Sequence, residues 1–204
     1  MKIIAHRVTD LTGAKRALEQ GVDFIEVDVA KRFFIPKFTI QHNGLKGKLG
    51  IGPVLGSILV PSLQKKLFLD LKQANISFRF ASKLSIFLKN FKVKPFRVCG
   101  HDWKIISSIC KNNNLLPFYT IRNQERVDNL EIIIQNLAKP AGFSIHYTLI
   151  DKNLIRRLKS DYPKCEIWAW TVNDLKTARN LIKLGVSGII TDEYELMIKQ
   201  LKSK

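Results

Sequence analysis

Carboxylate side chains recur at alternate positions in two short apolar segments of this 204-residue chain. Glu26 and Asp28 lie in FIEVDVA, and Asp70 lies in LFLDLK, where Lys72 repeats the spacing. Residues two apart on a strand point to the same face, so each pair would project together. Carboxylates that converge repel one another unless a cation lies between them. An all-oxygen ligand set selects Mg2+ or Ca2+, so a divalent cation is expected at Glu26, Asp28 and Asp70.

Two histidines end further apolar segments: His6 follows KIIA, and His42 follows FTIQ. Imidazole titrates near neutral pH and can accept or donate a proton, so such a pair suits general acid–base chemistry. A lone acidic pair is more often a surface or salt-bridged feature, and His101 and His146 are expected to be packed or hydrogen-bonded. Two acidic strands together with two strand-terminal histidines favour an active site.

Elements that could bring these residues together alternate along the chain. Strand-like and helical patterns follow one another, which favours a parallel sheet. Eight strands can close into a reduced (β/α)8 TIM barrel, with its active site at the C-terminal strand ends; one such domain is expected over residues 1–204. The expected strands are Lys2–His6, Phe24–Ala30, Leu67–Lys72, Phe96–Gly100, Leu116–Ile121, Gly142–Tyr147, Glu166–Val172 and Gly188–Thr191. The expected helices include Thr12–Gln20, Ala81–Asn90, Trp103–Asn112, Asn153–Ser160 and Leu175–Leu184.

The segment after the second strand breaks this alternation. Phe38–His42 follows too closely for a crossover helix, so an antiparallel hairpin is expected. Residues 43–61 are rich in glycine and apolar residues, with Lys46 and Lys48 among them, and are expected to form a loop. That loop either lies on an anionic membrane surface or closes the barrel where a crossover helix is missing. The second interpretation is favoured because one flank of the barrel would otherwise be bare.

Composition limits the class of protein. Hydrophobic residues make up 46% and charged residues 25%, a globular balance. Apolar runs are too interrupted to span a bilayer, the first residues lack a signal-peptide pattern, and three widely spaced cysteines favour a reducing compartment. A cytoplasmic location is expected, with peripheral membrane contact as an alternative.

Charge is the one unusual bulk property. Lysine and arginine number 34 against 17 acids, and residues 31–110 hold 15 basic and two acidic side chains. Such asymmetry favours anionic partners such as phosphate or a lipid surface, or it coats a solvated face. Nucleic acid is disfavoured because the phenylalanines of one segment are expected to pack in the core rather than stack on bases: Phe78, Phe80, Phe87 and Phe91.

The ordered motifs resemble those of the glycerophosphodiester phosphodiesterase family. IIAHR, GVDFIEVDVA, FTIQHNGL and LFLDLK are similar to the family's H-R, E-x-D, H-D and E-x-K, and AWTVNDLKTARNLIKLGVSGIITDEYELM is similar to its closing W-T-V-N-D and G-I-I-T-D. The anchors cover nearly the whole chain. The resemblance implies metal-dependent hydrolysis of a glycerophosphodiester to glycerol phosphate and an alcohol. It further implies that His6 and His42 form a general acid–base pair and that Glu26, Asp28 and Asp70 bind the metal. It also implies that Arg7 and Lys72 hold the phosphate and that Trp170 forms a wall of the substrate site.

Several positions depart from that pattern. Val8 replaces a glycine, residues 9–14 (TDLTGA) replace the family's E-N-T, Asn43 follows His42, and Asp70 replaces a glutamate. The same changes resemble sphingomyelinase D-type phospholipases, although no cysteine lies between His42 and Asp70 to tie that branch's catalytic loop. Glycerophosphodiester hydrolysis is favoured; the alternatives are cleavage of phospholipid head groups at a membrane, and a barrel without catalysis that binds anionic lipid or nucleic acid. The alcohol, the metal and the oligomeric state stay open.

Overall fold

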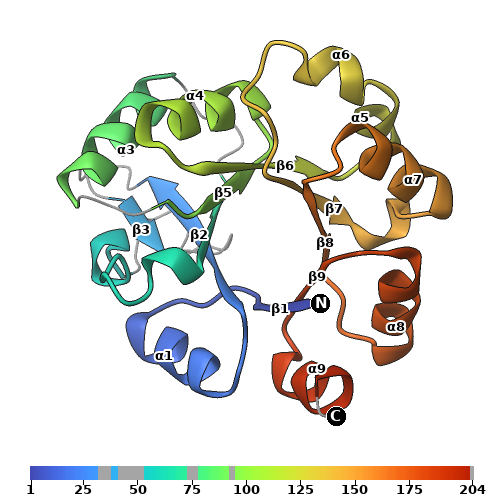
Figure 1. Cartoon of the computed structure of the whole chain (residues 1–204). Helices are drawn as coiled ribbons and strands as arrows, with labels where there is room; N and C mark the ends of the chain where they lie inside the picture. The colour runs from blue at the N-terminus through green and yellow to red at the C-terminus, as the bar shows by residue number, and fades with distance from the viewer. Residues whose placement is uncertain (32–37, 41–52, 73–77, 92–94, 203–204) are drawn as a thin grey trace.

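The computed structural model describes residues 1–31, 38–40, 53–72, 78–91 and 95–202. Its parallel strands form a closed barrel surrounded by helices (Figure 1), because β1 pairs with β9 on one side and with β2 on the other. The fold expected from the alternating pattern is therefore confirmed. The barrel strands are β1 (Lys2–Ala5), β2 (Phe24–Lys31), β4 (Leu67–Leu71), β5 (Arg97–Gly100), β6 (Leu116–Ile121), β7 (Gly142–His146), β8 (Glu166–Trp170) and β9 (Gly188–Thr191).

A ninth strand, β3 (Phe38–Ile40), pairs antiparallel with the end of β2, where Val29 lies opposite Ile40. The start of β2 pairs with β1 through Phe24 and Ile25. The far end of β2 thus continues past β1, and β3 takes the edge that β1 leaves. The expected hairpin is confirmed for the described part of the segment.

Helices follow the strands, and several begin at an aspartate that caps them. Asp10, Asp102, Asp151 and Asp174 each accept a hydrogen bond from the backbone N–H three residues later, which satisfies an otherwise unpaired helical donor. These caps fix where the chain turns back from the C-terminal end of the barrel. The helices are α1 (Leu11–Glu19), α3 (Phe78–Asn90), α4 (Trp103–Asn113), α5 (Gln124–Asp128), α6 (Leu130–Ile134), α7 (Lys152–Asp161), α8 (Leu175–Leu184) and α9 (Tyr194–Leu201), with 3-10 turns η1 (Leu55–Ser57), η2 (Gln64–Lys66) and η3 (Tyr147–Leu149).

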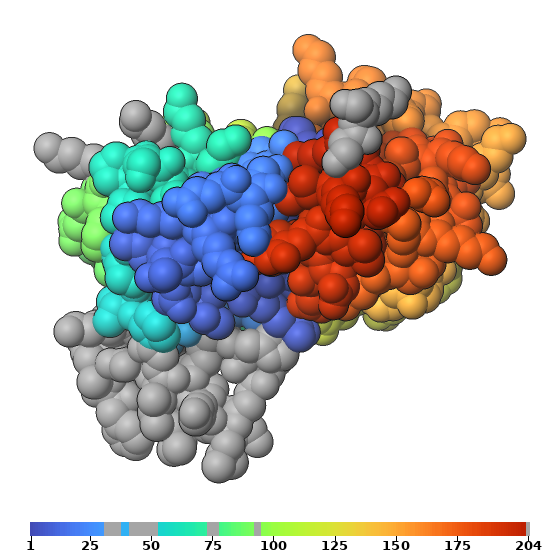
Figure 2. All heavy atoms as spheres, turned by 90° about the horizontal axis from the view of Figure 1, so that it is seen from below, coloured from blue at the N-terminus to red at the C-terminus, as the bar shows by residue number. Residues whose placement is uncertain are grey.

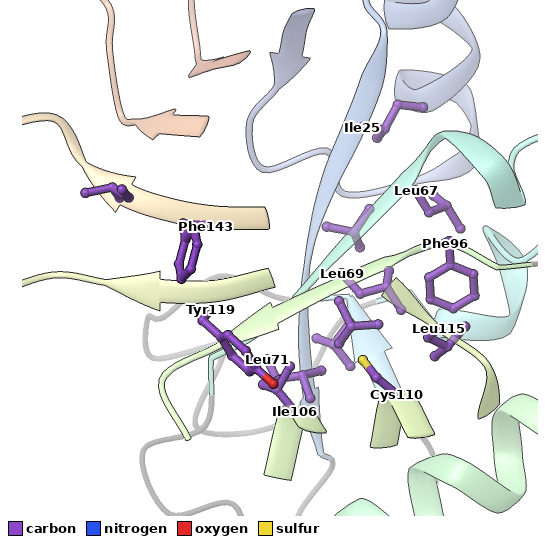
Figure 3. Packing of buried hydrophobic residues seen from close by; sticks show 14 of the residues in the cluster. Ile25, Leu67, Leu69, Leu71, Phe96, Ile106, Cys110, Leu115, Tyr119 and Phe143 are labelled. Carbon is purple, nitrogen blue, oxygen red and sulfur yellow. The ribbon is translucent and has the colours of Figure 1, made fainter. Parts of the chain in front are cut away.

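Two apolar cores follow from the alternation of side chains along each strand. Residues that face outward, such as Leu69 and Leu71, pack between the strands and the helices, near Ile106 and Cys110 of α4 (Figure 3). Residues that face inward fill the middle of the barrel: Ile4, Phe24, Phe68, Cys99, Phe118, Trp168 and Ile190. The barrel is therefore solid below its C-terminal end.

Ionic contacts close the N-terminal end of the barrel. Glu166 accepts hydrogen bonds from Lys2 at 2.7 Å and from Arg97 at 2.6 Å, and the Arg97 guanidinium lies 4.1 Å from the centre of the Phe24 ring. Gly142 contributes to the fit, because a Cβ there would lie 2.6 Å from the Glu166 carbonyl oxygen. This end stabilises the barrel and leaves the opposite end for a site.

The loop that follows β3 belongs to the core in its described part. Leu55 and Ile58 are fully buried, Leu59 nearly so, and Thr39 bridges to Val54. The loop therefore closes the barrel flank, and the membrane interpretation is wrong for Leu55 and Ile58. Residues 43–52 of this loop lie outside the described part.

Of the four phenylalanines that were expected to pack in the core, two do so and two are exposed. Phe80 is buried and Phe87 packs against the core, but Phe78 is 68% exposed and Phe91 38% exposed. The expectation is thus wrong for Phe78 and Phe91, which lie at the two ends of the amphipathic α3 pattern.

Among the described residues, no helix is long and apolar enough to cross a bilayer.

The first and last helices lie side by side on the surface, as Figure 2 shows for the blue and red segments. Gln20 donates a hydrogen bond to Glu195 at 2.9 Å, and Lys202 binds Asp23. These contacts reinforce the β1–β9 pairing that closes the barrel.

Candidate active site

Three carboxylates converge at the C-terminal end of the barrel. Glu26 and Asp28 project from β2, and Asp70 projects from the adjacent β4, where it lies in register with Asp28. One carboxylate oxygen from each lies within 4.8 Å of the others, and all three residues are almost fully buried. The structure therefore brings together the three predicted metal ligands in an arrangement that could hold a cation.

Lys72 lies among these carboxylates. Its Nζ is 2.5 Å from Asp70 Oδ2, 3.2 Å from Asp28 Oδ1 and 3.9 Å from Glu26 Oε1. Burial lowers the pKa of Lys72, but the three carboxylates outweigh it and raise that pKa above its usual value, so the ammonium stays charged. One ammonium balances only part of the charge of three carboxylates.

The negative charge that Lys72 leaves unbalanced contributes to a raised pKa of Glu26. Burial raises the pKa of Glu26 well above its usual value, and the neighbouring Asp28 raises it further. Within the described part of the chain, Glu26 Oε1 and Asp70 Oδ1 are buried and accept no hydrogen bond. Buried oxygens of this kind normally have a partner, and an all-oxygen donor set fits Mg2+ or Ca2+. The residues present thus fit a divalent cation.

The chain after β1 curls over the acidic cluster. Arg7 has φ 55°, in the left-handed region, and its backbone N–H donates to Glu26 Oε2 at 2.7 Å. The next N–H, of Val8, donates to the Glu26 carbonyl oxygen at 3.0 Å. Such a backbone conformation persists only where surrounding contacts impose it. Glu26 thereby fixes the turn that presents the exposed Arg7 side chain beside the pocket.

The side chain of His6 is 5% exposed and is held by Asp192 and Asn173, from the far end of the sequence. Its Nδ1 lies 2.8 Å from Asp192 Oδ1, and Asp192 also accepts a hydrogen bond from Asn173 Nδ2 at 2.8 Å. Because a carboxylate accepts, Nδ1 carries the proton in neutral His6, which leaves Nε2 with a lone pair. Burial lowers the pKa of His6 more than Asp192 raises it, so the ring is neutral near pH 7.

Asp192 and Asn173 were not among the predicted site residues. Asp192 directly follows β9, just as His6 directly follows β1, and it belongs to the closing segment that resembles G-I-I-T-D. Its position at a strand end is the signal that could have identified it. His42 lies outside the described residues, so its place in the site stays a prediction.

Trp170 lies at the mouth of the barrel on the side opposite the carboxylates. It lines one small pocket with Glu26, Asp70, Lys72 and His6, and its role as a substrate wall stays a prediction. Its ring centre is 5.0 Å from that of His146, whose Nδ1 lies 2.7 Å from Thr148 Oγ1, so His146 is hydrogen-bonded as expected. Sequence reasoning missed a further lining residue, Arg122, which follows β6.

The fold of this chain is similar to that of solved phosphodiesterase structures. No protein-family model matches the chain, and no curated protein matches it. Solved structures do match over nearly their whole length, and their names are those of the family that the motifs resemble. At identities of 20% or less this likeness establishes the shared fold.

Three of these structures illustrate the likeness. A glycerophosphodiester phosphodiesterase from Thermotoga maritima has a TM-score of 0.77 at 19% identity, covering 98% of this chain and 97% of that one. A phosphodiesterase from Oleispira antarctica, in complex with the product sn-glycerol-3-phosphate, has a TM-score of 0.75 at 17% identity, covering 100% and 97%. A glycerophosphodiester phosphodiesterase from Parabacteroides distasonis has a TM-score of 0.74 at 20% identity, covering 98% and 96%.

Proposed function

We propose that this chain is a metal-dependent phosphodiesterase that hydrolyses glycerophosphodiesters to glycerol phosphate and an alcohol. The observation that carries the proposal is the buried cluster of Glu26, Asp28 and Asp70 with Lys72, at the C-terminal end of a barrel. The barrel is shared with glycerophosphodiester phosphodiesterases, and the ordered motifs resemble theirs. The resemblance of fold and motifs supports this reaction, and the acidic cluster supports its dependence on a metal ion.

Charge neutralisation is the first requirement of this reaction. A phosphodiester anion resists nucleophilic attack until its negative charge is balanced. Lys72 and Arg7 would contact phosphate oxygens from two sides of the pocket, and Glu26, Asp28 and Asp70 would hold the metal. A bound Mg2+ or Ca2+ would supply further positive charge to the phosphoryl oxygens.

Proton transfer is the second requirement. Neutral His6 can accept a proton at Nε2 from the attacking hydroxyl, and Asp192 stabilises the imidazolium that forms. His42 would donate a proton to the oxygen of the leaving alcohol. One P–O bond forms to the incoming hydroxyl, the P–O bond to the alcohol breaks, and the overall reaction consumes one water.

An assay with three substrates tests this proposal. Hydrolysis of glycerophosphocholine, lysophosphatidylcholine and sphingomyelin would be measured with Mg2+ or Ca2+ and again with a chelator. We expect cleavage of glycerophosphocholine that the chelator abolishes. Asp28→Asn should lose calorimetric Mg2+ or Ca2+ binding with an unchanged circular dichroism spectrum, whereas the exposed Asp128→Asn should bind normally. Activity that survives the chelator would contradict the proposal.

A second candidate is cleavage of phospholipid head groups at a membrane. It is supported by the exposed face of α3, which combines apolar Phe78 and Ile86 with basic Arg79, Lys83 and Lys89 and has no acid. Such a face suits an anionic lipid surface. Faster turnover of lysophosphatidylcholine or sphingomyelin than of glycerophosphocholine would favour this candidate. Because all three substrates carry choline, only failure to cleave both them and glycerophosphoglycerol would favour a barrel that only binds.

A further inference from the structure

The pocket wall opposite the carboxylates has a different chemical character from the rest of the site. Its described lining residues come from β6, β7 and β8 and from the position directly after β6. They are hydroxyl, cationic and aromatic and include no acid: Thr120, Arg122, Ser144 and Trp170. Thr120 and Ser144 are buried beneath the mouth. The carboxylates in this lining, Glu26 and Asp70, come from β2 and β4. The pocket therefore has an acidic side and a side that donates hydrogen bonds.

The indole of Trp170 is already in contact with a cation. The Arg122 guanidinium lies 5.9 Å from its ring centre, within the range of a cation–π interaction. An aromatic ring is the usual partner of a quaternary ammonium ligand. Here such a ligand would meet the positive charge of Arg122 at the same ring. The arrangement disfavours a cationic head group.

The same indole presents a donor to the pocket. Trp170 Nε1 is buried and, in the part of the chain that the structure describes, has no hydrogen-bond partner. A buried indole N–H normally has an acceptor. An oxygen atom of a ligand would supply that acceptor, and the guanidinium of Arg122 offers further donors to the same group.

We infer, building on the proposed function, that this wall binds the alcohol part of the substrate and selects oxygen-rich, uncharged or anionic groups. The substrate class is then a glycerophosphodiester of a polyol, such as glycerophosphoglycerol or glycerophosphoinositol. Diesters of choline and ethanolamine, whose alcohol bears a positive charge, are disfavoured by Arg122.

The preference between a polyol and a choline diester tests the inference. kcat/KM would be measured for glycerophosphoglycerol and glycerophosphocholine with the wild type and Arg122→Gln. Arg126→Gln is the matched control, because Arg126 contacts Trp103 and the His101 carbonyl oxygen and does not line the pocket. Arg122 is exposed, so its interaction with a charge about 6 Å away is at least as strong as in bulk water, and Arg122→Gln should lower the polyol preference by at least about threefold.

Three results would overturn the inference: a wild-type preference for the choline diester, an equal loss for both substrates in Arg122→Gln, or the same change in Arg126→Gln. If neither substrate is cleaved, the proposed function fails, and binding decides the inference separately. Tryptophan fluorescence titration of His6→Ala with the two diesters should then show tighter binding of glycerophosphoglycerol. The double variant His6→Ala/Arg122→Gln should lose that difference, and equal affinities in His6→Ala would refute the inference.

Discussion

Replacing Lys72 by methionine removes the ammonium that contacts all three carboxylates of the acidic cluster. Methionine keeps an unbranched apolar stem, so the change is mainly one of charge. Removing one partner of a buried ion pair costs about 3–5 kcal/mol, because the remaining charge is left uncompensated. The lower end applies here, since Lys72 retains 19% exposure and Glu26 can hold a proton. In a chain of this size, about 3 kcal/mol corresponds to a Tm lower by roughly 6–12 °C.

Thermal unfolding followed by circular dichroism at neutral pH measures this effect. In a chelator, Lys72→Met should unfold well below the wild type, while Lys104→Met, at an exposed position of α4, should not. Added Mg2+ or Ca2+ should raise the Tm of Lys72→Met more than that of the wild type, because the ion replaces the missing positive charge. A variant Tm within about 2 °C of the wild type in chelator would refute the reasoning. If the ion raised the Tm of Lys72→Met and of the wild type equally, Lys72 would not neighbour the cation site.

Three other perturbations have directions that the structure fixes. Asp192→Asn removes the carboxylate that raises the pKa of His6, so the acidic limb of the pH profile of kcat/KM should move to lower pH; a shift to higher pH would contradict this. The raised pKa of Glu26 means that the folded state binds a proton more tightly than the unfolded state does. The urea midpoint of the metal-free protein should therefore fall as pH rises above the usual range of a glutamate pKa, and a midpoint that rose there would contradict this prediction. Gly142→Ala would press a Cβ against Phe118 and should lower the free energy of unfolding by about 1–3 kcal/mol; an unchanged urea midpoint would exclude that clash.

The strands were predictable because each carries a short apolar run with side chains alternating between two faces. The predicted segments match the barrel strands to within two residues at each end. The helices α5, α6 and α9 were not among those named from the sequence. For α5 and α6 the reason is length, since five residues each are too few to display a helical period. Leu55 and Ile58 illustrate a different limit: an apolar residue has the same identity whether it faces lipid or the core, and only the tertiary structure places it.

The acidic side of the site was predictable for the same reason as the strands. A period of two puts Glu26 with Asp28 and Asp70 with Lys72, and the pairing of β2 with β4 brings the two sets together. The partner of His6 was not predictable in this way, because Asp192 is 186 residues away and meets it only through closure of the barrel. Arg122 was missed because an arginine after a strand resembles any solvated charge in so basic a chain.

The pairing of β1 with β9 also sets an order on synthesis. Ile3 is made before its partner Ile189, which follows 186 residues later. At ordinary rates of translation β1 therefore keeps an open edge for roughly 10–40 s. An unpaired strand edge is a site where chains aggregate, so this interval is when a chaperone would matter most. His6 contacts Asp192 only after β9 has been made, because Asp192 directly follows β9. In a ribosome-bound chain that ends before β9, the His6 imidazole would lack the carboxylate that orients it.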